Sequence, residues 1–176
     1  CKLCDTDFIG VDGLGGGQFK TAQELAEEVK SYWPQSDANA QPRVICTGGE
    51  PLLQLDGDLI DALHEVGFKI GVETNGTLAA PTGIDWLCVS PKANAPLVQT
   101  TGDELKLVYP QAENQPEDFA DLNFKVFSLQ PLDTSTVDTT ALDDRYQDTH
   151  KATFEYCMAN PRWRLSLQTH KYLGVR

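Results

Sequence analysis

Residues 43–76 read RVICTGGEPLLQLDGDLIDALHEVGFKIGVETNG, and this stretch decides the fold. Its first run, Arg43–Thr47, is short and apolar and ends in the turn Gly48-Gly49-Glu50-Pro51, which predicts a buried strand followed by a turn with an exposed backbone. An apolar stripe at helical spacing then ends at Gly67, and a second strand-like run covers Lys69–Thr74. Strand, turn, helix and strand in this order predict a parallel β-α-β unit.

The same unit recurs along the chain. The later strand-like runs, each ending in polar or turn residues, are Asp85–Val89, Glu104–Val108, Phe124–Leu129 and Trp163–Leu167. A capping box at Thr21–Glu24 predicts a helix that runs to Trp33, a second helix is expected within residues 139–159, and the segment from Pro91 to Glu104 is expected to be loop. We therefore expect one α/β domain over residues 1–176, with a parallel sheet of about five or six strands.

Composition narrows the classes of function. The chain has 176 residues, 14 Lys and Arg against 26 Asp and Glu, and a net charge of -12. The basic residues are scattered, so the sequence offers no basic stripe for a phosphate backbone and argues against direct nucleic-acid binding. No apolar run approaches the roughly 20 residues of a membrane helix.

Two thiols open the sequence as Cys1-Lys2-Leu3-Cys4. Two thiolates at this spacing can hold one metal centre, but zinc needs four ligands and an iron-sulfur cluster three or four, so at least one ligand is expected from elsewhere. The other three cysteines, Cys46, Cys88 and Cys157, are solitary, and the first two sit in apolar runs that predict buried thiols. The glycine-rich loop that follows Cys4 argues against a thioredoxin-like redox pair. The odd number of cysteines argues against a disulfide framework.

Polar and turn residues gather where the predicted strands end. They are Thr47, Gly48, Gly49, Glu50, Glu73, Thr74, Ser90, Lys92, Gln130, Asp133, Gln168 and His170. Turn residues are common at strand ends for structural reasons alone. In parallel α/β folds, however, ligands bind at the carboxyl ends of the strands, so the repetition at several strand ends predicts a binding site there.

Several motifs of the chain resemble those of one enzyme family. They are Cys4-Asp5-Thr6-Asp7-Phe8, Thr47-Gly48-Gly49-Glu50-Pro51, Glu73-Thr74-Asn75-Gly76, Val89-Ser90-Pro91-Lys92, Gln130-Pro131 and the closing WRLSLQTHKYL of residues 163–173. A CxxC and a GGEP turn resemble the radical S-adenosylmethionine superfamily, and the whole set resembles the 7-carboxy-7-deazaguanine synthases within it. This resemblance implies an incomplete, compressed (β/α) barrel whose N-terminal strand and first cluster cysteine lie upstream of Cys1.

The resemblance also implies a chemistry. A 4Fe-4S cluster would bind S-adenosylmethionine, whose reductive cleavage gives a 5'-deoxyadenosyl radical. The radical would take hydrogen from C6 of 6-carboxy-5,6,7,8-tetrahydropterin, and ring contraction with loss of ammonia would give 7-carboxy-7-deazaguanine, a step of queuosine and 7-deazapurine biosynthesis. Mg2+, a reducing electron donor such as flavodoxin, a homodimer and a cytoplasmic location are implied with it.

The resemblance assigns roles to individual residues. It makes Cys1 and Cys4 cluster ligands and Thr6 the magnesium contact, in keeping with the ligand types these ions prefer. The S-adenosylmethionine contacts it implies are Leu3, Cys4, Asp5, Gly49, Ser90, Pro91, Lys92, Gln130, Pro131, Leu132 and Asp133. The substrate contacts it implies are Thr47, Glu73, Gln168, His170 and Arg176. A pterin edge offers adjacent N-H donors that the Glu73 carboxylate can accept together.

Two departures and two rival functions accompany this reading. The first cluster cysteine is absent, as are the family's Gln-Gly-Glu segment and its substrate-binding arginine, so the sequence as numbered is expected to be inactive alone. One rival is an activase of the same superfamily that installs a glycyl radical on a protein partner. The other is a zinc-binding interaction module without catalysis, using Cys1 and Cys4.

Overall fold

The computed structural model describes residues 11, 16–33, 40–133 and 148–174. Within these residues, six strands form one parallel sheet in the order β1-β2-β3-β4-β5-β6. The strands are β1 (Arg43–Cys46), β2 (Lys69–Thr74), β3 (Trp86–Val89), β4 (Thr101–Tyr109), β5 (Asn123–Pro131) and β6 (Trp163–Leu165). The helices are α1 (Ala22–Ser31), α2 (Gly57–Glu65), α3 (Thr149–Ala159) and α4 (Thr169–Leu173), with short 3-10 turns η1 (Pro51–Leu53) and η2 (Pro116–Phe119).

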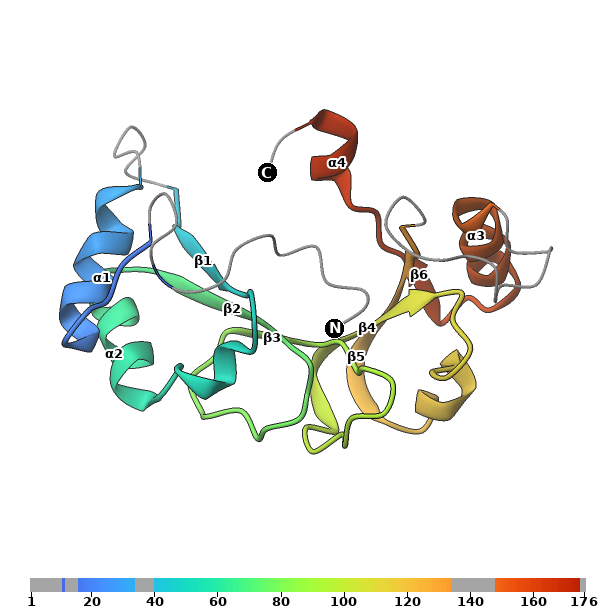
Figure 1. Ribbon diagram of the computed structural model, residues 1–176, viewed down its shortest axis with the longest axis horizontal. Coiled ribbons are helices and arrows are strands. Elements are labelled where there is room, and N and C mark those ends of the chain that lie inside the picture. Colours follow the sequence, from blue (N-terminus) through green and yellow to red (C-terminus); the bar gives the residue numbers. More distant parts are fainter. Residues whose placement is uncertain (1–10, 12–15, 34–39, 134–147, 175–176) are drawn as a thin grey trace.

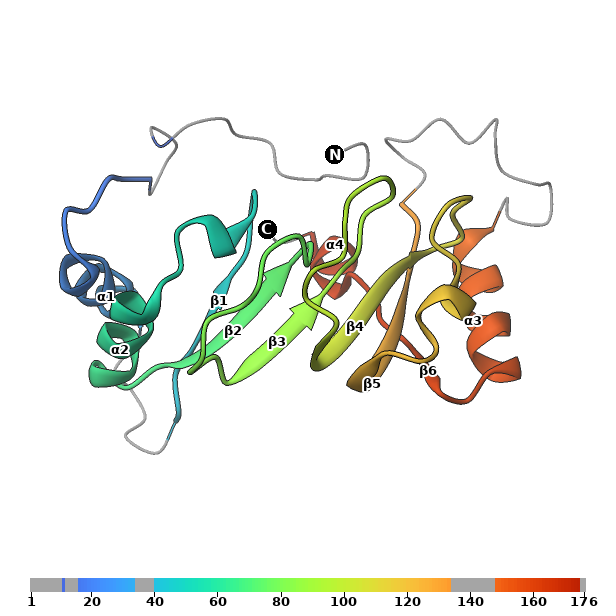
Figure 2. The same ribbon diagram turned by 90° about the horizontal axis from the view of Figure 1, so that it is seen from below.

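The sheet is an open arc and does not close into a barrel. Across the described residues, β1 and β6 each pair with one neighbour only. Helices α1 and α2 pack together beside β2 at one end of the arc, and α3 packs on β5 and β6 at the other (Figure 1). Helix α4 stands over the opening of the arc in Figure 1 and behind the sheet in the turned view of Figure 2. The arc therefore has a convex face that carries helices and a concave face that looks toward α4.

Alternate residues of the strands build these two faces. Ile70, Val72, Leu105, Leu107 and Leu129 are at most 1% exposed and form the centre of the core, together with Ile60 and Leu63 of α2. Each such side chain stabilises the fold by about 1.5–3 kcal/mol through burial. The residues between them point to the concave face, where the strand register aligns Glu73 with Cys88 and Lys106 with Ser128. The core and the polar concave face are thus interleaved along the same strands.

Local sequence signals set the helix boundaries. The Thr21 side chain accepts a hydrogen bond from the backbone N-H of Glu24 at 3.1 Å, and Oε2 of Glu24 accepts one from the backbone N-H of Lys20 at 2.9 Å. Helix α2 begins after Asp56, whose side chain accepts from the Leu59 N-H at 3.0 Å, and the chain leaves it through Gly67 at a φ of 97°. None of the helices in the described ranges has the length and apolar character needed to cross a membrane.

Most predicted elements are confirmed, with the following corrections. Strand β4 begins at Thr101, so the end of the segment from Pro91 to Glu104, which was expected to be loop, is strand. Helix α1 ends at Ser31 with Tyr32 as its C-cap, two residues before the predicted end at Trp33. Strand β6 ends at Leu165, two residues before Leu167. The prediction of a buried first strand is wrong, because β1 lies at the sheet edge, where Ile45 is 50% exposed and Cys46 is only partly buried. Cys88, on the inner strand β3, is 2% exposed, as predicted.

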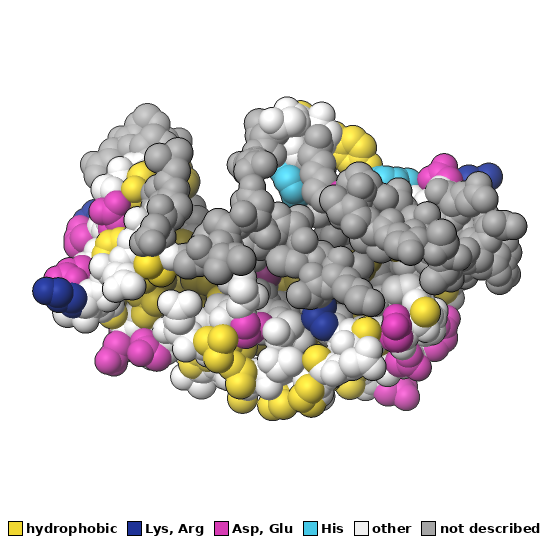
Figure 3. Space-filling model, in the orientation of Figure 1, with side chains coloured by type: hydrophobic (Ala, Val, Ile, Leu, Met, Phe, Trp, Pro, Cys, Tyr) yellow, Lys and Arg dark blue, Asp and Glu magenta, His cyan; other side chains and the backbone are white. Residues whose placement is uncertain are grey.

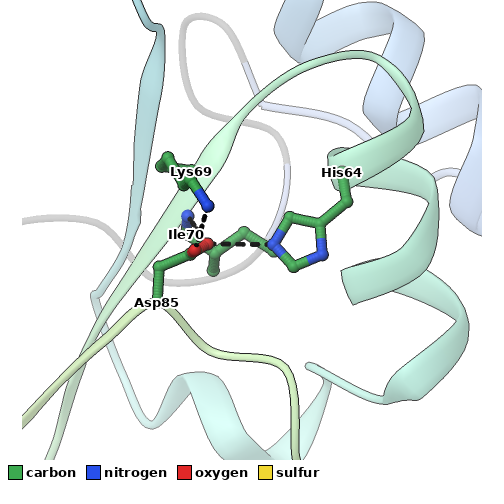
Figure 4. A network of polar contacts seen from close by, with 4 residues as sticks. All are labelled: His64, Lys69, Ile70 and Asp85. Atoms are coloured by element: carbon green, nitrogen blue, oxygen red, sulfur yellow. Dashed lines mark hydrogen bonds and ion pairs between the residues drawn. The ribbon is translucent and has the colours of Figure 1, made fainter.

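A polar network at the amino ends of the strands joins α2 to the sheet (Figure 4). The Asp85 carboxylate accepts hydrogen bonds from Lys69 Nζ at 2.7 Å and from the Ile70 N-H at 2.8 Å, and lies 2.9 Å from Nε2 of His64. Burial alone would raise the pKa of Asp85, but these hydrogen bonds outweigh it and hold the pKa well below its ordinary value. The His64 ring is therefore engaged with the Asp85 carboxylate in this network.

Candidate functional site

A pocket of about 600 Å3 opens at the carboxyl ends of the strands, on the concave face. We call it the strand-end pocket. Its walls are Ile45, Thr47, Gly48, Gly49, Glu73, Thr74, Asn75, Ser90, Lys92, Lys106, Val108, Gln130, Ser166, Leu167, Gln168 and His170. The ends of β1 to β5, the segment after β6, and α4 all contribute side chains. The volume falls in the range of small-molecule and cofactor sites.

The turn after β1 is held to the end of β2 by the Glu50 carboxylate. Its Oε1 accepts from the Thr74 hydroxyl at 2.7 Å and from the Leu52 N-H at 3.1 Å, and its Oε2 accepts from the Asn75 N-H at 2.8 Å. Glu50 is thus engaged in fixing two turns and is not presented to the pocket.

The two glycines of this turn adopt left-handed backbone conformations, with φ of 77° at Gly48 and 56° at Gly49. A Cβ at either position would meet no atom of the described residues within 4 Å. The backbone of this turn therefore borders open space inside the pocket, where a ligand group can approach its N-H and C=O groups closely.

The turn after β3 supplies a second polar cluster. The Ser90 N-H donates to the Thr74 carbonyl at 2.8 Å, which ties this turn to β2. Nζ of Lys92 donates to the Ser90 carbonyl at 2.8 Å and to the Ser90 hydroxyl oxygen at 2.7 Å. The Lys92 ammonium thereby lies at the pocket wall, with the Ser90 side chain fixed beside it.

An ion pair lies at the floor of the pocket. Lys106 Nζ donates to Oε2 of Glu73 at 2.5 Å; the Lys106 side chain is 16% exposed and the Glu73 side chain 42%. Burial alone would lower the pKa of Lys106, but its hydrogen bond to Glu73 and the negative charges of Glu73 and Glu104 outweigh this and raise the pKa above its ordinary value. Lys106 is therefore a cation at neutral pH, lying beneath a carboxylate that faces the pocket.

The structure brings many of the predicted site residues into this one pocket. They are Thr47, Gly49, Glu73, Ser90, Lys92, Gln130, Gln168 and His170. They lie together because all six strands of the described sheet are parallel, which places the carboxyl ends of the strands at one edge. His170 and Gln168 reach the pocket from the opposite side, on and just before α4.

Other predicted residues lie beside the pocket or outside the described part of the chain. Pro91, Pro131, Leu132 and Asp133 do not line it. Leu132 is 5% exposed, its N-H donates to the Tyr109 carbonyl, and its carbonyl accepts from Thr149 Oγ1 at 2.7 Å. Cys1, Leu3, Cys4, Asp5, Thr6 and Arg176 lie outside the described residues. Among the described residues, no group of three or more His, Cys, Asp or Glu side chains could hold a metal ion.

Six pocket residues were not predicted from the sequence, and they are Lys106, Ile45, Asn75, Val108, Ser166 and Leu167. The signal for Lys106 was present in Glu104-Leu105-Lys106-Leu107-Val108, where apolar and polar residues alternate. Leu105 and Leu107 are fully buried, so Lys106 between them faces the opposite side of the sheet. A lysine in the middle of an inner strand of a parallel sheet is a marker of a polar face.

The open parallel sheet with a polar pocket at its strand ends defines the chain as an α/β protein with a candidate small-ligand site at the carboxyl edge of its sheet. No family model matches the chain. It is 54% identical to the 7-carboxy-7-deazaguanine synthase of Caulobacter vibrioides, over 99% of this chain and 78% of that protein. It is 54% identical to that of Bradyrhizobium diazoefficiens, over 100% and 79% of the two chains. The chain belongs to the 7-carboxy-7-deazaguanine synthase family, and it is an enzyme of that family.

The fold is similar to that of a solved structure, QueE from Escherichia coli. The TM-score is 0.55 and the identity 25%, and the match covers 81% of this chain and 63% of that one. The predicted incomplete α/β barrel is thereby confirmed at the level of the open parallel sheet. This chain spans less than two thirds of the length of that structure.

Proposed function

We propose that this chain is the pocket-bearing part of a radical S-adenosylmethionine lyase, organised as one domain. Its reaction would convert 6-carboxy-5,6,7,8-tetrahydropterin to 7-carboxy-7-deazaguanine with loss of ammonia, in queuosine and 7-deazapurine biosynthesis. The observation that carries the proposal is the Glu73 carboxylate, which faces a strand-end pocket shared with Thr47, Ser90 and His170, in a chain of this family.

The substrate half of the proposal rests on hydrogen-bond chemistry. A pterin carries adjacent N-H donors on its aminopyrimidinone edge, and an ionised carboxylate is the acceptor best suited to such a pair. Among the described residues, the one hydrogen bond to the Glu73 side chain comes from Lys106 and reaches Oε2, so Oε1 retains acceptor capacity in a side chain that lines the pocket. Thr47, Gln168 and His170 supply further polar groups around the same space. We assign Arg176 to the substrate as well.

The cofactor half rests on the opposite wall. The open backbone at Gly49 suits a methionyl ammonium, and Ser90, Lys92 and Gln130 offer donors and acceptors for a nucleoside. We assign Leu3, Asp5, Pro91, Pro131, Leu132 and Asp133 to the same cofactor as flanking contacts. Cys1 and Cys4 would hold the 4Fe-4S cluster together with a third thiolate, and Thr6 would bind Mg2+. When bound, the cluster and S-adenosylmethionine supply the radical that abstracts hydrogen from the substrate.

The rival functions fit the site less well. An activase that acts on a protein needs an opening for a polypeptide, whereas the described pocket is of small-molecule size and presents a carboxylate at its floor. Zinc binding by Cys1 and Cys4 alone would not account for a polar pocket at the strand ends. A reducing partner such as flavodoxin, a homodimer and a cytoplasmic location are part of the proposal.

Acidic side chains gather over both ends of the arc on the face shown in Figure 3, and the basic side chains on that face stand apart from one another.

The decisive experiment is an anaerobic assay of the complete enzyme with its cluster reconstituted. Dithionite, S-adenosylmethionine and the carboxytetrahydropterin are supplied, and 7-carboxy-7-deazaguanine is measured by mass spectrometry. Iron analysis should give about four irons per chain. Cleavage of S-adenosylmethionine without the deazaguanine product would overturn the substrate assignment and keep the superfamily. Zinc in place of iron would overturn both.

Two variants divide the proposal further. Glu73→Gln should raise the KM for the pterin and leave the iron content unchanged. Glu113→Gln, which makes the same change at an exposed position away from the pocket, is its control. Thr6→Ala should weaken the response of the rate to Mg2+, and an unaltered response would remove Thr6 from the metal site.

A further inference from the structure

The Glu73-Lys106 ion pair crosses an intervening strand. Glu73 is on β2 and Lys106 on β4, and β3 lies between them. The register aligns Glu73 with Cys88 and Cys88 with Glu104, so the lysine stands two residues beyond this row on the same face. Neighbouring strands lie about 4.8 Å apart, so only a long side chain can bridge from β4 to β2. A cysteine on β3 leaves room for the lysine stem.

The two partners of the pair differ in exposure. The Lys106 side chain is 16% exposed and lies deeper, while the Glu73 side chain is 42% exposed and faces the pocket. The contact is made at Oε2 of Glu73, and among the described residues no hydrogen bond reaches Oε1. The lysine therefore fixes one carboxylate oxygen, while the other keeps acceptor capacity beside the pocket that Glu73 lines.

We propose that Lys106 is a positioning residue for substrate binding: it acts through Glu73, holding that carboxylate in the orientation that receives the paired N-H donors of the pterin edge. The inference rests on the proposed function and deepens it. A carboxylate on a free side chain must lose rotamer entropy when it binds a planar donor pair, and an existing charge-assisted hydrogen bond removes part of that cost before the ligand arrives. Lys106 stays protonated, so it serves as a donor and not as a base.

A double-mutant cycle tests this directly. Binding of 6-carboxypterin, an oxidised analogue that cannot react, is measured by calorimetry on the complete enzyme loaded with its cluster and S-adenosylmethionine. The four proteins are the wild type, Glu73→Gln, Lys106→Met and the double variant. We expect Lys106→Met to weaken binding about tenfold, within the range of couplings between contacting residues, and the double variant to bind no more weakly than Glu73→Gln alone. Under turnover, KM should rise while kcat is largely kept.

Matched variants separate positioning from general structural damage. Lys106→Arg keeps a cation that can donate to the carboxylate and should recover most of the affinity. Lys125→Met breaks another strand ion pair, Lys125 with Asp103 at 2.6 Å, away from the strand-end pocket, and should leave the affinity unchanged. The affinity for S-adenosylmethionine should be the same in all of these proteins.

Each other outcome contradicts the inference in its own way. Additive losses in the double variant would mean that Lys106 contacts the ligand independently of Glu73. Unchanged affinity in Lys106→Met, or no recovery by arginine, would remove its positioning role while leaving the proposed function intact. If the wild type neither binds the pterin nor forms product, the proposed function itself fails, and the inference falls with it.

Discussion

The Thr74 hydroxyl donates a hydrogen bond of 2.7 Å to Oε1 of Glu50, across 24 positions of sequence. This bond joins the turn after β1 to the end of β2, and the same Thr74 oxygen accepts from the Gly76 N-H at 3.1 Å. Thr74 is 2% exposed, so the contact is made out of water. The turn after β1 and the end of β2, which both line the pocket, are therefore held against each other.

Thr74→Val should reduce both stability and ligand binding. Valine keeps the shape but leaves the Gly76 N-H without this acceptor and the Glu50 carboxylate with one donor fewer, at a cost of about 1–3 kcal/mol. Denaturant unfolding of the protein without its cluster measures this loss. Thr82→Val, at an exposed position, is the control and should lie within about 0.5 kcal/mol of the wild type. Equal stability of the two variants would contradict the role given to Thr74.

Gly76→Ala should be strongly destabilising. Gly76 has a φ of 78°, and a Cβ there would lie 2.7 Å from Leu97 Cδ1 and 2.7 Å from Val89 Cγ1. Left-handed backbone strain and overpacking each cost about 1–2 kcal/mol, so a total loss of about 2–4 kcal/mol is expected in thermal or denaturant unfolding.

Gly57→Ala is the matched control for that substitution. Gly57 begins α2, and a Cβ there would meet no atom within 4 Å. Alanine should stabilise the protein by about 0.4–1 kcal/mol by restricting the unfolded chain. A loss at this position comparable with that at Gly76 would show that the local geometry does not decide the effect.

Asp85 should make stability depend on pH in the acid range. Its folded-state pKa is held below the unfolded value of about 3.9, so its contribution is fully present above about pH 5 and is lost as the pH falls further. Asp85→Asn should therefore lower the free energy of unfolding at pH 7 by roughly 1–3 kcal/mol, and the difference from the wild type should shrink toward pH 3. Asp61→Asn, on the exposed side of α2, should show neither effect. A difference that stays constant between pH 7 and pH 3 would contradict the depressed pKa.

Cys88 should be the slowest of the described thiols to react. Burial raises its pKa to about 12, and the residue is 2% exposed. Cys46 and Cys157 are only partly buried, and burial raises the pKa of each as well. Labelling with iodoacetamide at pH 8, followed by peptide mass spectrometry, should modify these two well before Cys88. In guanidinium the three rates should become similar, and fast native labelling of Cys88 would show that β3 opens to solvent.

The sequence was sufficient for the order of elements and for the edge of the sheet that carries the pocket. The apolar runs of β2, β3, β4 and β5 predicted strands because burial on the core face selects such residues. The helix start at Thr21 followed from side-chain chemistry that is local to one turn. Strand-end residues such as Glu73 and Ser90 could be predicted for a different reason, because parallel strands place their carboxyl ends together whatever the details of packing.

What escaped prediction depends on neighbours that are distant in sequence. The exposure of Ile45 follows from the position of β1 at the sheet edge, which no feature within β1 reveals. The link between Lys106 and Glu73 depends on the register of three strands, and the contacts that hold Leu132 depend on Tyr109 and Thr149. Such pairings are tertiary and leave no local pattern.

The interleaving of core and pocket residues along each strand has a consequence for how the protein can change. Leu105 and Leu107 are buried in the core, while Lys106 between them and Val108 after them line the pocket, so neighbouring residues of one strand belong to different parts of the molecule. A library that randomises only the concave-face positions of β4 and β5 would sample new ligands without touching the core. The core-facing and the pocket-facing residues of each strand can therefore be varied separately, and a scaffold of this kind is a suitable starting point for directed evolution.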